Sequence, residues 1–212
     1  MPEPVPYPLP KRLLDKGLAA LLLVLLSPLL LVVTAATILD VLLVRADRGA
    51  VLYRERRVSR GRTFDLLKFR TLRLQPLEQM RREGSHARLY ESDSANLTWA
   101  GRRVLKPWYL DELPQLVNVL RGEISLVGPR PWPPSMVERQ IAEGDDYRNL
   151  VIAGLTGPAQ VTKGVSGARY AELDRAYVQA CRTSGGLQLV RHDLAILRQT
   201  IGVLARGEGL SY

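Results

Sequence analysis

The feature that most constrains the fold of this chain is an uncharged, strongly apolar stretch near its N-terminus. It runs from Gly17 to Leu39 and consists mostly of Leu, Val and Ala. As a single helix, a stretch of this length would cross the ~30 Å hydrocarbon core of a bilayer. Ser27 and Pro28 lie near its centre, where proline removes a backbone hydrogen bond and the serine hydroxyl can bond the freed carbonyl. We therefore expect two half-helices of about 10 residues, each reaching only the bilayer midplane.

Basic residues flank both ends of this stretch: Lys11, Arg12 and Lys16 precede it, and Arg45 and Arg48 follow it. Because basic flanks favour the cytoplasmic side, both flanks are accommodated only if the chain turns back. We expect a short tail over residues 1–10 and a re-entrant membrane hairpin over residues 11–48, with its break at Ser27 and Pro28. A kinked spanning helix is the alternative, since proline occurs in many spanning helices. A cleaved signal peptide is disfavoured because its apolar region would be shorter.

The remaining residues, 49–212, are enough for one catalytic or binding domain of ordinary size. Residues 51–53 and 64–69 resemble two short strands of a hairpin, joined by the basic stretch 56–62. We expect helices over residues 76–88, 113–120, 135–147 and 168–182, and a glycine-rich loop over 154–167. The expected fold class is α+β, mainly helical, with the re-entrant segment, a small hairpin and amphipathic interfacial helices.

The last predicted helix has the clearest periodicity. Apolar residues recur at spacings of three and four, with arginines between them, at Leu187, Val190, Leu194, Leu197, Ile201 and Leu204. Such a stripe suits a helix at a membrane interface as well as a core helix. We expect core packing, because most apolar stripes of this kind face a domain interior.

Charge composition indicates anionic partners. The net charge is +9 and the pI about 10.0, and most basic residues are arginine, whose planar fork suits bidentate binding of phosphate. Acidic lipids and phosphorylated substrates fit this composition. Nucleic acid is disfavoured because the chain has two Phe and no recognised nucleic-acid-binding motif. The single Cys181 cannot form an intramolecular disulfide, and His86 and His192 are too far apart in sequence to indicate structural zinc.

Two adjacent carboxylates, Asp111 and Glu112, precede Pro114, a residue tolerated in the first turn of a helix. Both should therefore lie at or just before a helix N-terminus, which favours the ionised carboxylate. An ionised Asp can act as a nucleophile, and its neighbour can bind Mg²⁺ or move a proton. The alternative is an N-cap Asp followed by a favourable first-turn Glu.

Five motifs follow one another along the chain: Lys68-Phe69-Arg70-Thr71, Leu110-Asp111-Glu112-Leu113-Pro114-Gln115-Leu116, Asn118 to Glu123, Ser125 to Pro131, and Gly154 to Val161. In this order they resemble the bacterial sugar transferase family, the monotopic phosphoglycosyl transferases of polyprenyl-phosphate glycan pathways. The similarity runs from about Lys11 to Thr200. With no long multi-pass domain before it, the chain resembles the minimal form of the family.

The resemblance implies transfer of a phospho-sugar from a nucleoside diphosphate sugar, expected to be a UDP-sugar, to polyprenyl phosphate, with release of UMP. Asp111 would be the nucleophile, forming a covalent phospho-sugar, and Glu112 the Mg²⁺ ligand. The protein is expected on the cytoplasmic face of the bacterial inner membrane, in contact with membrane lipids, at the first membrane step of glycan assembly. An oligomer is compatible with the sequence.

The resemblance also assigns substrate- or phosphate-binding roles to Lys68, Arg70, Lys106, Arg130, Gln160, Lys163 and Asp174. Lys68 and Arg70 alternate along a strand and are expected to share a phosphate-binding face. Lys106 stands where the family usually has Arg, and residues 162–164 replace the usual Asn-Gly-Arg, so phosphate contacts and donor choice should differ there. Asp174 either assists the metal or donor, or is a solvated helix residue.

Two other classes of function are compatible with parts of the sequence. A catalytically inactive, membrane-associated scaffold could keep the same fold, but it would have no physical need for the intact set of Asp111, Glu112, Lys68, Arg70 and Arg130. A basic, membrane-anchored nucleic-acid binder would show affinity that falls steeply with salt. Release of UMP from UDP-sugars in the presence of polyprenyl phosphate and Mg²⁺ separates these classes from a transferase.

Overall fold

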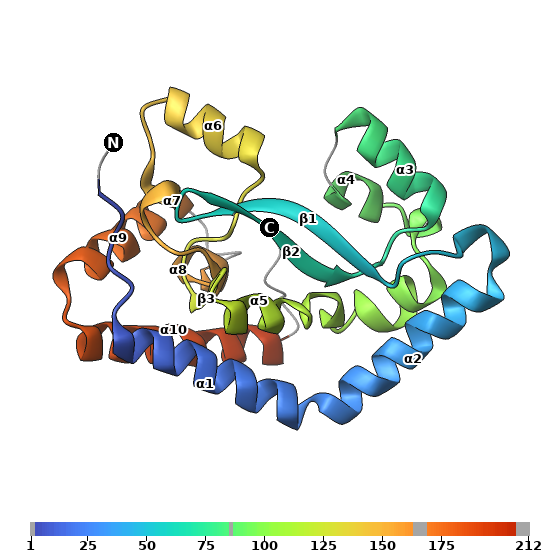
Figure 1. Ribbon diagram of the computed structural model, residues 1–212, viewed down its shortest axis with the longest axis horizontal. Coiled ribbons are helices and arrows are strands. Elements are labelled where there is room, and N and C mark those ends of the chain that lie inside the picture. The colour runs from blue at the N-terminus through green and yellow to red at the C-terminus, as the bar shows by residue number, and fades with distance from the viewer. Residues whose placement is uncertain (1–2, 85–86, 163–168, 207–212) are drawn as a thin grey trace. The chain divides into compact units, whose positions relative to one another are not determined.

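The computed structural model describes residues 3–84, 87–162 and 169–206, and it is mostly helical with two small sheets (Figure 1). The helices are α1 (Leu9–Leu25), α2 (Ser27–Leu43), α3 (Leu74–Glu83), α4 (Ala87–Glu91), α5 (Gln115–Arg121), α6 (Pro134–Ala142), α7 (Tyr147–Leu150), α8 (Pro158–Val161), α9 (Tyr170–Thr183) and α10 (Gly186–Ala205). The strands are β1 (Leu52–Ser59), β2 (Arg62–Phe69), β3 (Ser125–Val127) and β4 (Gly154–Thr156). The α+β, mainly helical class is confirmed.

The chain divides into two compact units, and each is composed of separate stretches of sequence. Unit 1 contains Met1–Leu21, Glu55–Leu66 and Leu116–Tyr212, and unit 2 contains Leu22–Arg54 and Leu67–Gln115. The expected boundaries between tail, membrane hairpin and catalytic domain concern membrane placement and stay predictions.

The β1–β2 hairpin is longer, and its turn shorter, than the sequence indicated. The strands β1 and β2 are joined by Arg60 and Gly61 alone, and both of these residues have positive φ, 50° and 71°. Positive φ at both central residues is the requirement of a type I′ turn. Of the basic residues expected in the connecting stretch, Arg56 and Arg57 lie in β1 and Arg62 begins β2. Exposed and more buried positions alternate along most of β1, as in a strand with one covered face.

Three of the expected helical or loop segments are subdivided in the structure. The segment expected as one helix over 76–88 is α3, which ends at Gly84 in the left-handed conformation (φ 61°), followed by the separate α4. The helix expected over 135–147 is likewise α6 followed by α7, and the expected loop 154–167 contains β4 and α8. Residues 163–168 of that loop lie outside the described residues.

The centre of unit 1 is the parallel pair β3–β4, in which Ser125 is opposite Gly154 and Val127 opposite Thr156. Glycines bring the connections after these strands into direct contact. A Cβ on Gly157 would lie 2.3 Å from the carbonyl oxygen of Gly128, which is closer than non-bonded atoms can approach. The two glycine-containing motifs that end at Pro131 and Val161 are therefore packed against each other.

A buried ion pair attaches the beginning of α1 to α10. Lys11 is 1% exposed and lies 2.5 Å from Asp193 of α10, and its ammonium also donates to the carbonyl of Val127. The hydroxyl of Tyr177 donates to the other oxygen of Asp193. Lys11 was expected as a basic flank of the membrane segment, but it is an internal residue of unit 1.

Asp15 makes a second buried connection from α1. It is fully buried, and its carboxylate accepts hydrogen bonds from the hydroxyl of Ser125, the backbone N–H of Leu126 and the hydroxyl of Tyr7. Three donors satisfy this buried anion. The first half of α1 is thus part of the polar core of unit 1.

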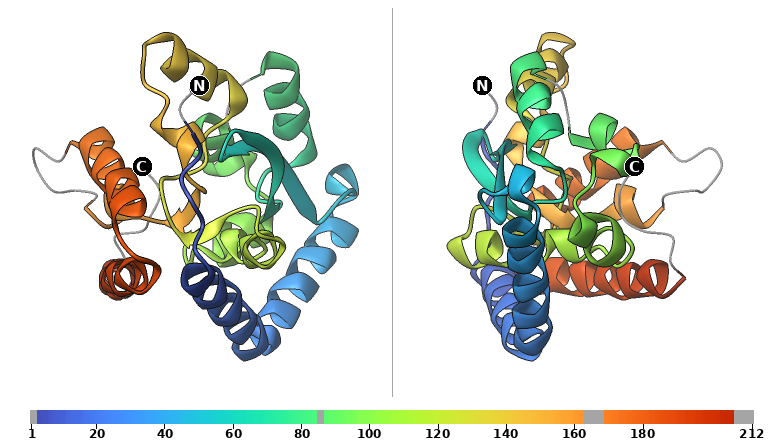
Figure 2. Two further views of the ribbon diagram at one scale, coloured as in Figure 1. Left: turned by 60° about the vertical axis from the view of Figure 1, so that its left-hand side comes forward. Right: turned by 90° about the vertical axis from the view of Figure 1, so that its right-hand side faces the viewer.

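Helix α10 does not bury the stripe that the sequence indicated. Leu187, Leu194, Ile201 and Leu204 are exposed by 72, 47, 68 and 43%. The buried face instead carries Leu189, Ile196 and Val203 with two polar residues, Asp193 and Thr200. The expectation of core packing for the stripe was wrong because these polar residues have buried partners: Thr200 bonds the hydroxyl of Thr156, and Asp193 bonds Lys11. Figure 2 shows α10 turning sharply out of α9.

Unit 2 has two small apolar clusters and two capping carboxylates. One cluster is centred on Val33, Phe69 and Leu105, and the other on Leu72, Leu77 and Met80. Asp40 near the end of α2 accepts a hydrogen bond from the backbone N–H of Ala100, and Asp47 accepts one from that of Leu74 at the start of α3. These contacts hold the C-terminal end of α2 within unit 2.

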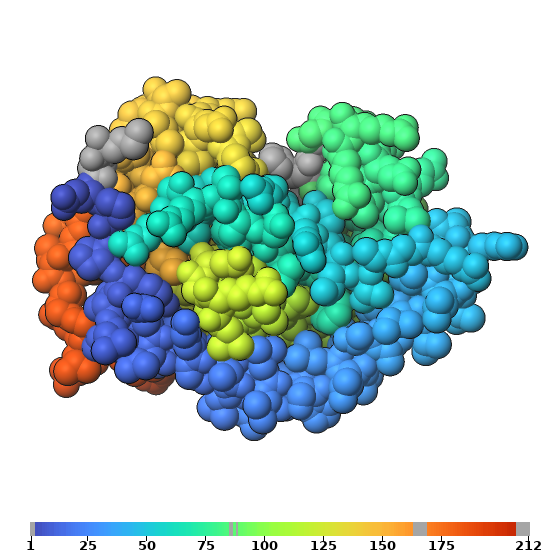
Figure 3. All heavy atoms as spheres, viewed as in Figure 1, coloured from blue at the N-terminus to red at the C-terminus, as the bar shows by residue number. Residues whose placement is uncertain are grey.

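Helices α1 and α2 form a bent pair. Within the described residues no single helix is long and apolar enough to cross a membrane, but this pair passes by length and composition together, with a bend of 65°. The hydroxyl of Ser27 donates to the carbonyl of Val24, as expected for a break at Ser27 and Pro28. Leu31, Val32, Leu39 and Leu43 of α2 are more than half exposed, and α2 is uncovered in the view of Figure 3.

Candidate active site

The two carboxylates lie in a segment of irregular backbone in unit 2. A five-residue π-helix, Gly101–Leu105, precedes Lys106, and Asp111 and Glu112 lie in the 3₁₀ turn Leu110–Glu112. Tyr109, directly before that turn, has φ 55°, which is unusual for a bulky residue. Both π-helical and left-handed residues are enriched at functional sites. The dyad precedes α5, which begins at Gln115 directly after Pro114, as the sequence indicated.

Asp111 is buried against a lysine. It is 2% exposed, and its Oδ2 lies 3.2 Å from Nζ of Lys106. The same ammonium lies 2.6 Å from Oε2 of Glu91, at the end of α4. The hydroxyl of Thr71 donates to the other oxygen of Glu91. Lys106 is thus held between two carboxylates, one of which is the expected nucleophile.

Burial raises the pKa of Asp111 above its ordinary value, because the anion loses hydration. The ammonium of Lys106 opposes this shift, and the negative charge of Glu112 adds to it. The sequence-based expectation that a helix N-terminus keeps Asp111 ionised therefore needs correction, since Lys106 is the main group that favours the anion. For Lys106 itself, burial alone would lower the pKa, but Asp111 and Glu91 outweigh burial and raise it.

Glu112 is more accessible than Asp111. Its side chain is 22% exposed, and Oε1 lies 3.7 Å from Nζ of Lys68 on β2, whose side chain is 15% exposed. The two adjacent carboxylates are therefore paired with different lysines. A partly accessible carboxylate beside an ammonium can meet a charged ligand without complete desolvation of either group.

Arg70 is placed differently from Lys68. It is 2% exposed, and its guanidinium donates to the backbone carbonyls of Asp47, Ala50 and Leu72. It therefore ties together the loop after α2 and the end of β2. The expected phosphate-binding face shared by Lys68 and Arg70 is not supported by this arrangement, because the donors of Arg70 already serve the backbone. Its role toward phosphate stays a prediction.

The carboxylates of Asp111 and Glu112 fit a magnesium ion only if substrate phosphates and water supply its other ligands. Among residues 3–84, 87–162 and 169–206, no group of three or more His, Cys, Asp and Glu side chains is arranged to hold a metal ion. Mg²⁺ usually binds proteins through one or two carboxylates, with waters and substrate phosphates as its other ligands. The accessible oxygens of Glu112 fit that donor set.

Arg130 and its surroundings belong to unit 1. Arg130 follows β3 and is half-buried, and its backbone carbonyl accepts a hydrogen bond of 2.8 Å from Arg148. The Arg148 guanidinium also lies 3.8 Å from the centre of the Trp132 ring. Arg148 thus fixes the backbone of the loop that presents Arg130. The phosphate-binding role of Arg130 stays a prediction.

Asp174 is the ion-pair partner of Arg148. It is fully buried on α9, and its Oδ2 lies 2.9 Å from Nη2 of Arg148. Burial raises the pKa of Asp174, and Arg148 opposes that shift. The alternative that Asp174 is a solvated helix residue is wrong, since the side chain supports Arg148 inside unit 1.

Gln160 on α8 is fully buried, and neither polar atom of its side-chain amide has a hydrogen-bond partner in the described part of the chain. A buried amide without partners costs free energy, which suits a group kept for a ligand. Lys163, the other expected donor-binding residue of this segment, lies outside the described residues.

The sequence analysis assigned no role to Glu91, Thr71 or Arg148, although Thr71 ends the motif that begins at Lys68. Glu91 is 20 residues from Thr71, and Arg148 is 26 residues from Asp174, so no local spacing connects these partners.

The family model for bacterial sugar transferases matches residues 7–207 of the chain. The chain belongs to the bacterial sugar transferase family. The match includes every described site residue named above, from Lys68 to Asp174.

Curated relatives agree with this assignment. The chain is 34% identical over 209 residues to an uncharacterized sugar transferase of Haemophilus influenzae, which covers 94% of this chain and 41% of the relative. It is 37% identical over 173 residues to the UDP-glucose:undecaprenyl-phosphate glucose-1-phosphate transferase of Caulobacter vibrioides, covering 80% of this chain and 60% of the relative. It is 36% identical over 185 residues to the exopolysaccharide production protein ExoY of Sinorhizobium fredii, covering 80 and 76%. The chain spans less than two thirds of the length of the first two relatives.

Proposed function

We propose that this protein transfers a phospho-sugar from a UDP-sugar to polyprenyl phosphate and releases UMP. The observation that carries the proposal is the buried carboxylate of Asp111, paired at 3.2 Å with Lys106 and adjacent in sequence to the more accessible Glu112. The name of the Caulobacter vibrioides relative describes transfer of glucose 1-phosphate from UDP-glucose to undecaprenyl phosphate. This activity of the relative supplies the reaction class.

In the first step, an oxygen of Asp111 attacks the phosphorus that carries the sugar. The new bond joins that oxygen to phosphorus, and the phosphoanhydride bond to the nucleoside phosphate breaks, so that UMP leaves with the electron pair. Lys106 favours the anionic state of Asp111 that this attack needs, because its ammonium opposes the rise in the pKa of Asp111 that burial causes.

In the second step, an oxygen of polyprenyl phosphate attacks the same phosphorus and Asp111 leaves as a carboxylate. No net proton is consumed in either step when both attacking groups are anions. The two-step route lets donor and acceptor use one phosphate site in turn, so a small site is sufficient for two large substrates.

Glu112 would hold Mg²⁺ together with the donor phosphates, and that ion would neutralise the diphosphate and the leaving nucleotide. Lys68, 3.7 Å from Glu112, adds a positive charge on the same side of the dyad. Arg130, Gln160 and Lys163 are proposed donor-binding residues on the basis of the resemblance.

We also propose that α1 and α2 enter the cytoplasmic leaflet and turn back at Ser27 and Pro28. Both outer ends of the pair are held by buried polar contacts in globular parts of the chain, through Lys11 to Asp193 and through Asp40 to Ala100. A re-entrant pair keeps both ends on one face of the membrane, and its apolar middle remains in lipid. The acceptor phosphate would then lie at headgroup level.

The test is release of UMP by the purified, detergent-solubilised chain supplied with Mg²⁺, polyprenyl phosphate and, in separate reactions, a panel of UDP-sugars. We expect UMP with at least one donor, and a loss of at least ~10³-fold for Asp111→Asn, because an amide cannot attack phosphorus. Glu138→Gln, at an exposed position of α6, is the matched control and should keep full activity. A wild-type chain that binds donor but releases no UMP would favour the inactive scaffold.

A further inference from the structure

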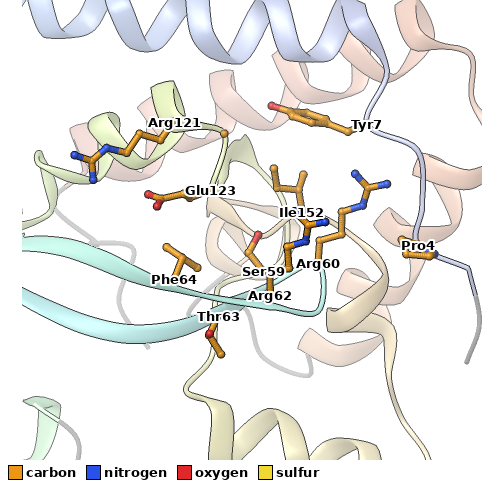
Figure 4. Close-up of a pocket in the computed structure, with 11 residues that line it drawn as sticks. Pro4, Tyr7, Ser59, Arg60, Arg62, Thr63, Phe64, Arg121, Glu123 and Ile152 are labelled. Carbon is orange, nitrogen blue, oxygen red and sulfur yellow. The ribbon is translucent and has the colours of Figure 1, made fainter.

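A cavity of about 530 Å³ opens in unit 1 beside the turn of the β1–β2 hairpin (Figure 4). Its volume falls in the range of ~300–1,000 Å³ that small-molecule sites occupy. All its lining residues belong to unit 1, whereas Asp111 and Glu112 belong to unit 2. None of the residues to which the proposed transfer reaction assigns a role lines this cavity.

The charged residues of the cavity wall are mostly arginines. Arg60 and Arg62 come from the hairpin and Arg121 from the end of α5, and Glu123 is the carboxylate among the lining residues. Oε2 of Glu123 already accepts a hydrogen bond of 2.6 Å from the buried amide of Asn118. Figure 4 shows the Arg121 side chain extending away from Arg60 and Arg62, so the two hairpin arginines supply the positive charge on their side of the cavity, against one carboxylate that is already hydrogen-bonded. This positive charge favours an anionic ligand.

Arg60 occupies a backbone position that does not favour arginine. Its φ of 50° lies in the left-handed region, where the first position of a type I′ turn prefers Asn, Asp or Gly. An arginine kept there at a conformational cost suggests that its side chain is needed. Figure 4 shows Arg60 and Arg62 extending from the hairpin toward the side where Tyr7 and Ile152 lie.

The walls of the cavity are held in place by the surrounding backbone. The N–H of Arg60 donates to the carbonyl of Val151 at 3.1 Å, and the hydroxyl of Ser59 accepts from the N–H of Ala153 at 3.0 Å. The N–H of Val5 donates to the carbonyl of Leu150, which fixes the N-terminal stretch that contributes Pro4 and Tyr7. A site fixed before binding loses little entropy when a ligand enters.

We propose that this cavity is a second anion site, which binds a phosphate-bearing molecule through Arg60 and Arg62. Guanidinium groups bind phosphate oxygens through paired N–H donors, and two of them from one hairpin suit a phosphate group. The same chemistry is offered by a phospholipid headgroup and by a soluble phosphate compound. The site is additional to the transfer reaction and does not depend on it.

The test compares two double variants that remove the same charge. The double variant Arg60→Asn, Arg62→Gln removes two guanidinium groups from the cavity wall. Because Asn before Gly61 suits a type I′ turn, the fold should be kept or stabilised. Arg139→Gln with Arg182→Gln removes two exposed arginines that do not line the cavity. Arg121→Gln, at the exposed end of α5, is a further control, because its guanidinium extends away from Arg60 and Arg62 (Figure 4).

Each variant is measured in two arms, with the full-length chain. In the soluble arm, pyrophosphate without Mg²⁺ is titrated against the protein in uncharged detergent. In the lipid arm, the thermal midpoint is compared between nanodiscs of phosphatidylcholine and nanodiscs that also contain phosphatidylglycerol. We expect the Arg60→Asn, Arg62→Gln double variant to lose at least ~10-fold in pyrophosphate affinity, or to lose the stabilisation by phosphatidylglycerol, while the control variants behave as wild type.

The arm in which the Arg60→Asn, Arg62→Gln double variant differs from the control variants identifies the source of the phosphate, a soluble compound or a lipid headgroup. If the hairpin double variant and the control pair give the same result in both arms, or if both double variants lose affinity equally, the net positive charge of the protein attracts anions without a specific site. Either result would contradict the proposal. No turnover is measured in either arm, so failure of this proposal leaves the proposed transfer reaction unaffected, and the reverse also holds.

Discussion

At the scale of residues, the Lys106 side chain determines the state of the proposed nucleophile. Asp111 is almost completely buried, and burial raises its pKa, so that without a positive neighbour its protonated form would be favoured further. Lys106 supplies that neighbour at 3.2 Å. A lysine here contacts Asp111 through a single point charge, whereas an arginine would offer a planar fork of donors.

Removal of that charge should change the pH dependence of activity. In Lys106→Met the opposition to burial is lost and the pKa of Asp111 rises further, so Asp111 becomes protonated, and inactive, at a higher pH than in the wild type. We expect the acid limb of UMP release to move to higher pH, with a larger loss at pH 6 than at pH 8. Lys106→Arg keeps the charge and should keep the wild-type limb. An unmoved acid limb in Lys106→Met would show that Lys106 does not control Asp111.

How much of the site could be predicted depends on where the partners lie in sequence. Asp111 and Glu112 are adjacent, and Pro114 marks the following helix, so their position could be predicted. Glu91 and Arg148 contact residues distant in sequence, and such contacts depend on the tertiary structure. For Arg70, strand alternation predicted a shared face with Lys68. Strand alternation could not show that the guanidinium of Arg70 would donate its hydrogen bonds to backbone carbonyls within unit 2.

At the scale of elements, the packing of the turns after β3 and β4 gives a direct test of the glycine motifs. In Gly157→Ala, the new Cβ would lie 2.3 Å from the carbonyl oxygen of Gly128, so the backbone must shift. We expect a loss of about 1–3 kcal/mol in the free energy of unfolding, the usual range for overpacking. Gly185→Ala is the matched control, because a Cβ there meets no heavy atom within 4 Å. Equal thermal midpoints for the two variants would contradict the close packing.

The break between α1 and α2 allows a test of topology. Pro28→Leu would permit a continuous apolar helix of about 23 residues, long enough to span a bilayer, and should move the N-terminus outward in part of the population. Cysteines placed near Lys11 or Arg48, with Cys181 replaced, report this through an impermeant thiol reagent added outside the cell. The unmutated segment should be protected at both positions. Turnover with the lipid acceptor should fall in Pro28→Leu although no catalytic residue has changed.

Ser27→Ala is the control for the proline variant. It removes only the hydroxyl that donates to the carbonyl of Val24, and Pro28 remains, so its labelling pattern should stay that of the wild type. External labelling near Lys11 in the unmutated chain would contradict re-entry and indicate a helix that spans the membrane.

The elements show which patterns in a sequence are informative. The break at Ser27 and Pro28 could be predicted, because proline acts locally. The hairpin was expected as an element, but its two-residue turn was not, since residues 56–62 were expected to be the connection. The buried face of α10 could not be predicted from hydrophobicity, because Asp193 and Thr200 occupy that face and only their distant partners, Lys11 and Thr156, make this favourable. An apolar stripe that is exposed in the structure fits the interfacial alternative that the sequence left open.

At the scale of the whole molecule, the chain combines a charge of +9, an apolar bent helix pair and two adjacent carboxylates, one of them buried, in a member of the bacterial sugar transferase family. Each feature alone has an ordinary structural explanation. Together they suit an enzyme that handles a phosphorylated donor in solution and a phosphorylated lipid in the membrane, which is the central claim of the proposed function.

The covalent intermediate on Asp111 tests that claim most directly. The purified chain is incubated with Mg²⁺ and a UDP-sugar that supports UMP release, without polyprenyl phosphate, then quenched in acid and its intact mass measured. We predict a fraction of the wild type heavier by one phospho-sugar, which disappears when polyprenyl phosphate is added. The adduct should be present in Glu138→Gln and absent from Asp111→Asn. An adduct of equal yield in Asp111→Asn, or release of UMP by the wild type with no adduct at any time, would contradict a nucleophilic role for Asp111.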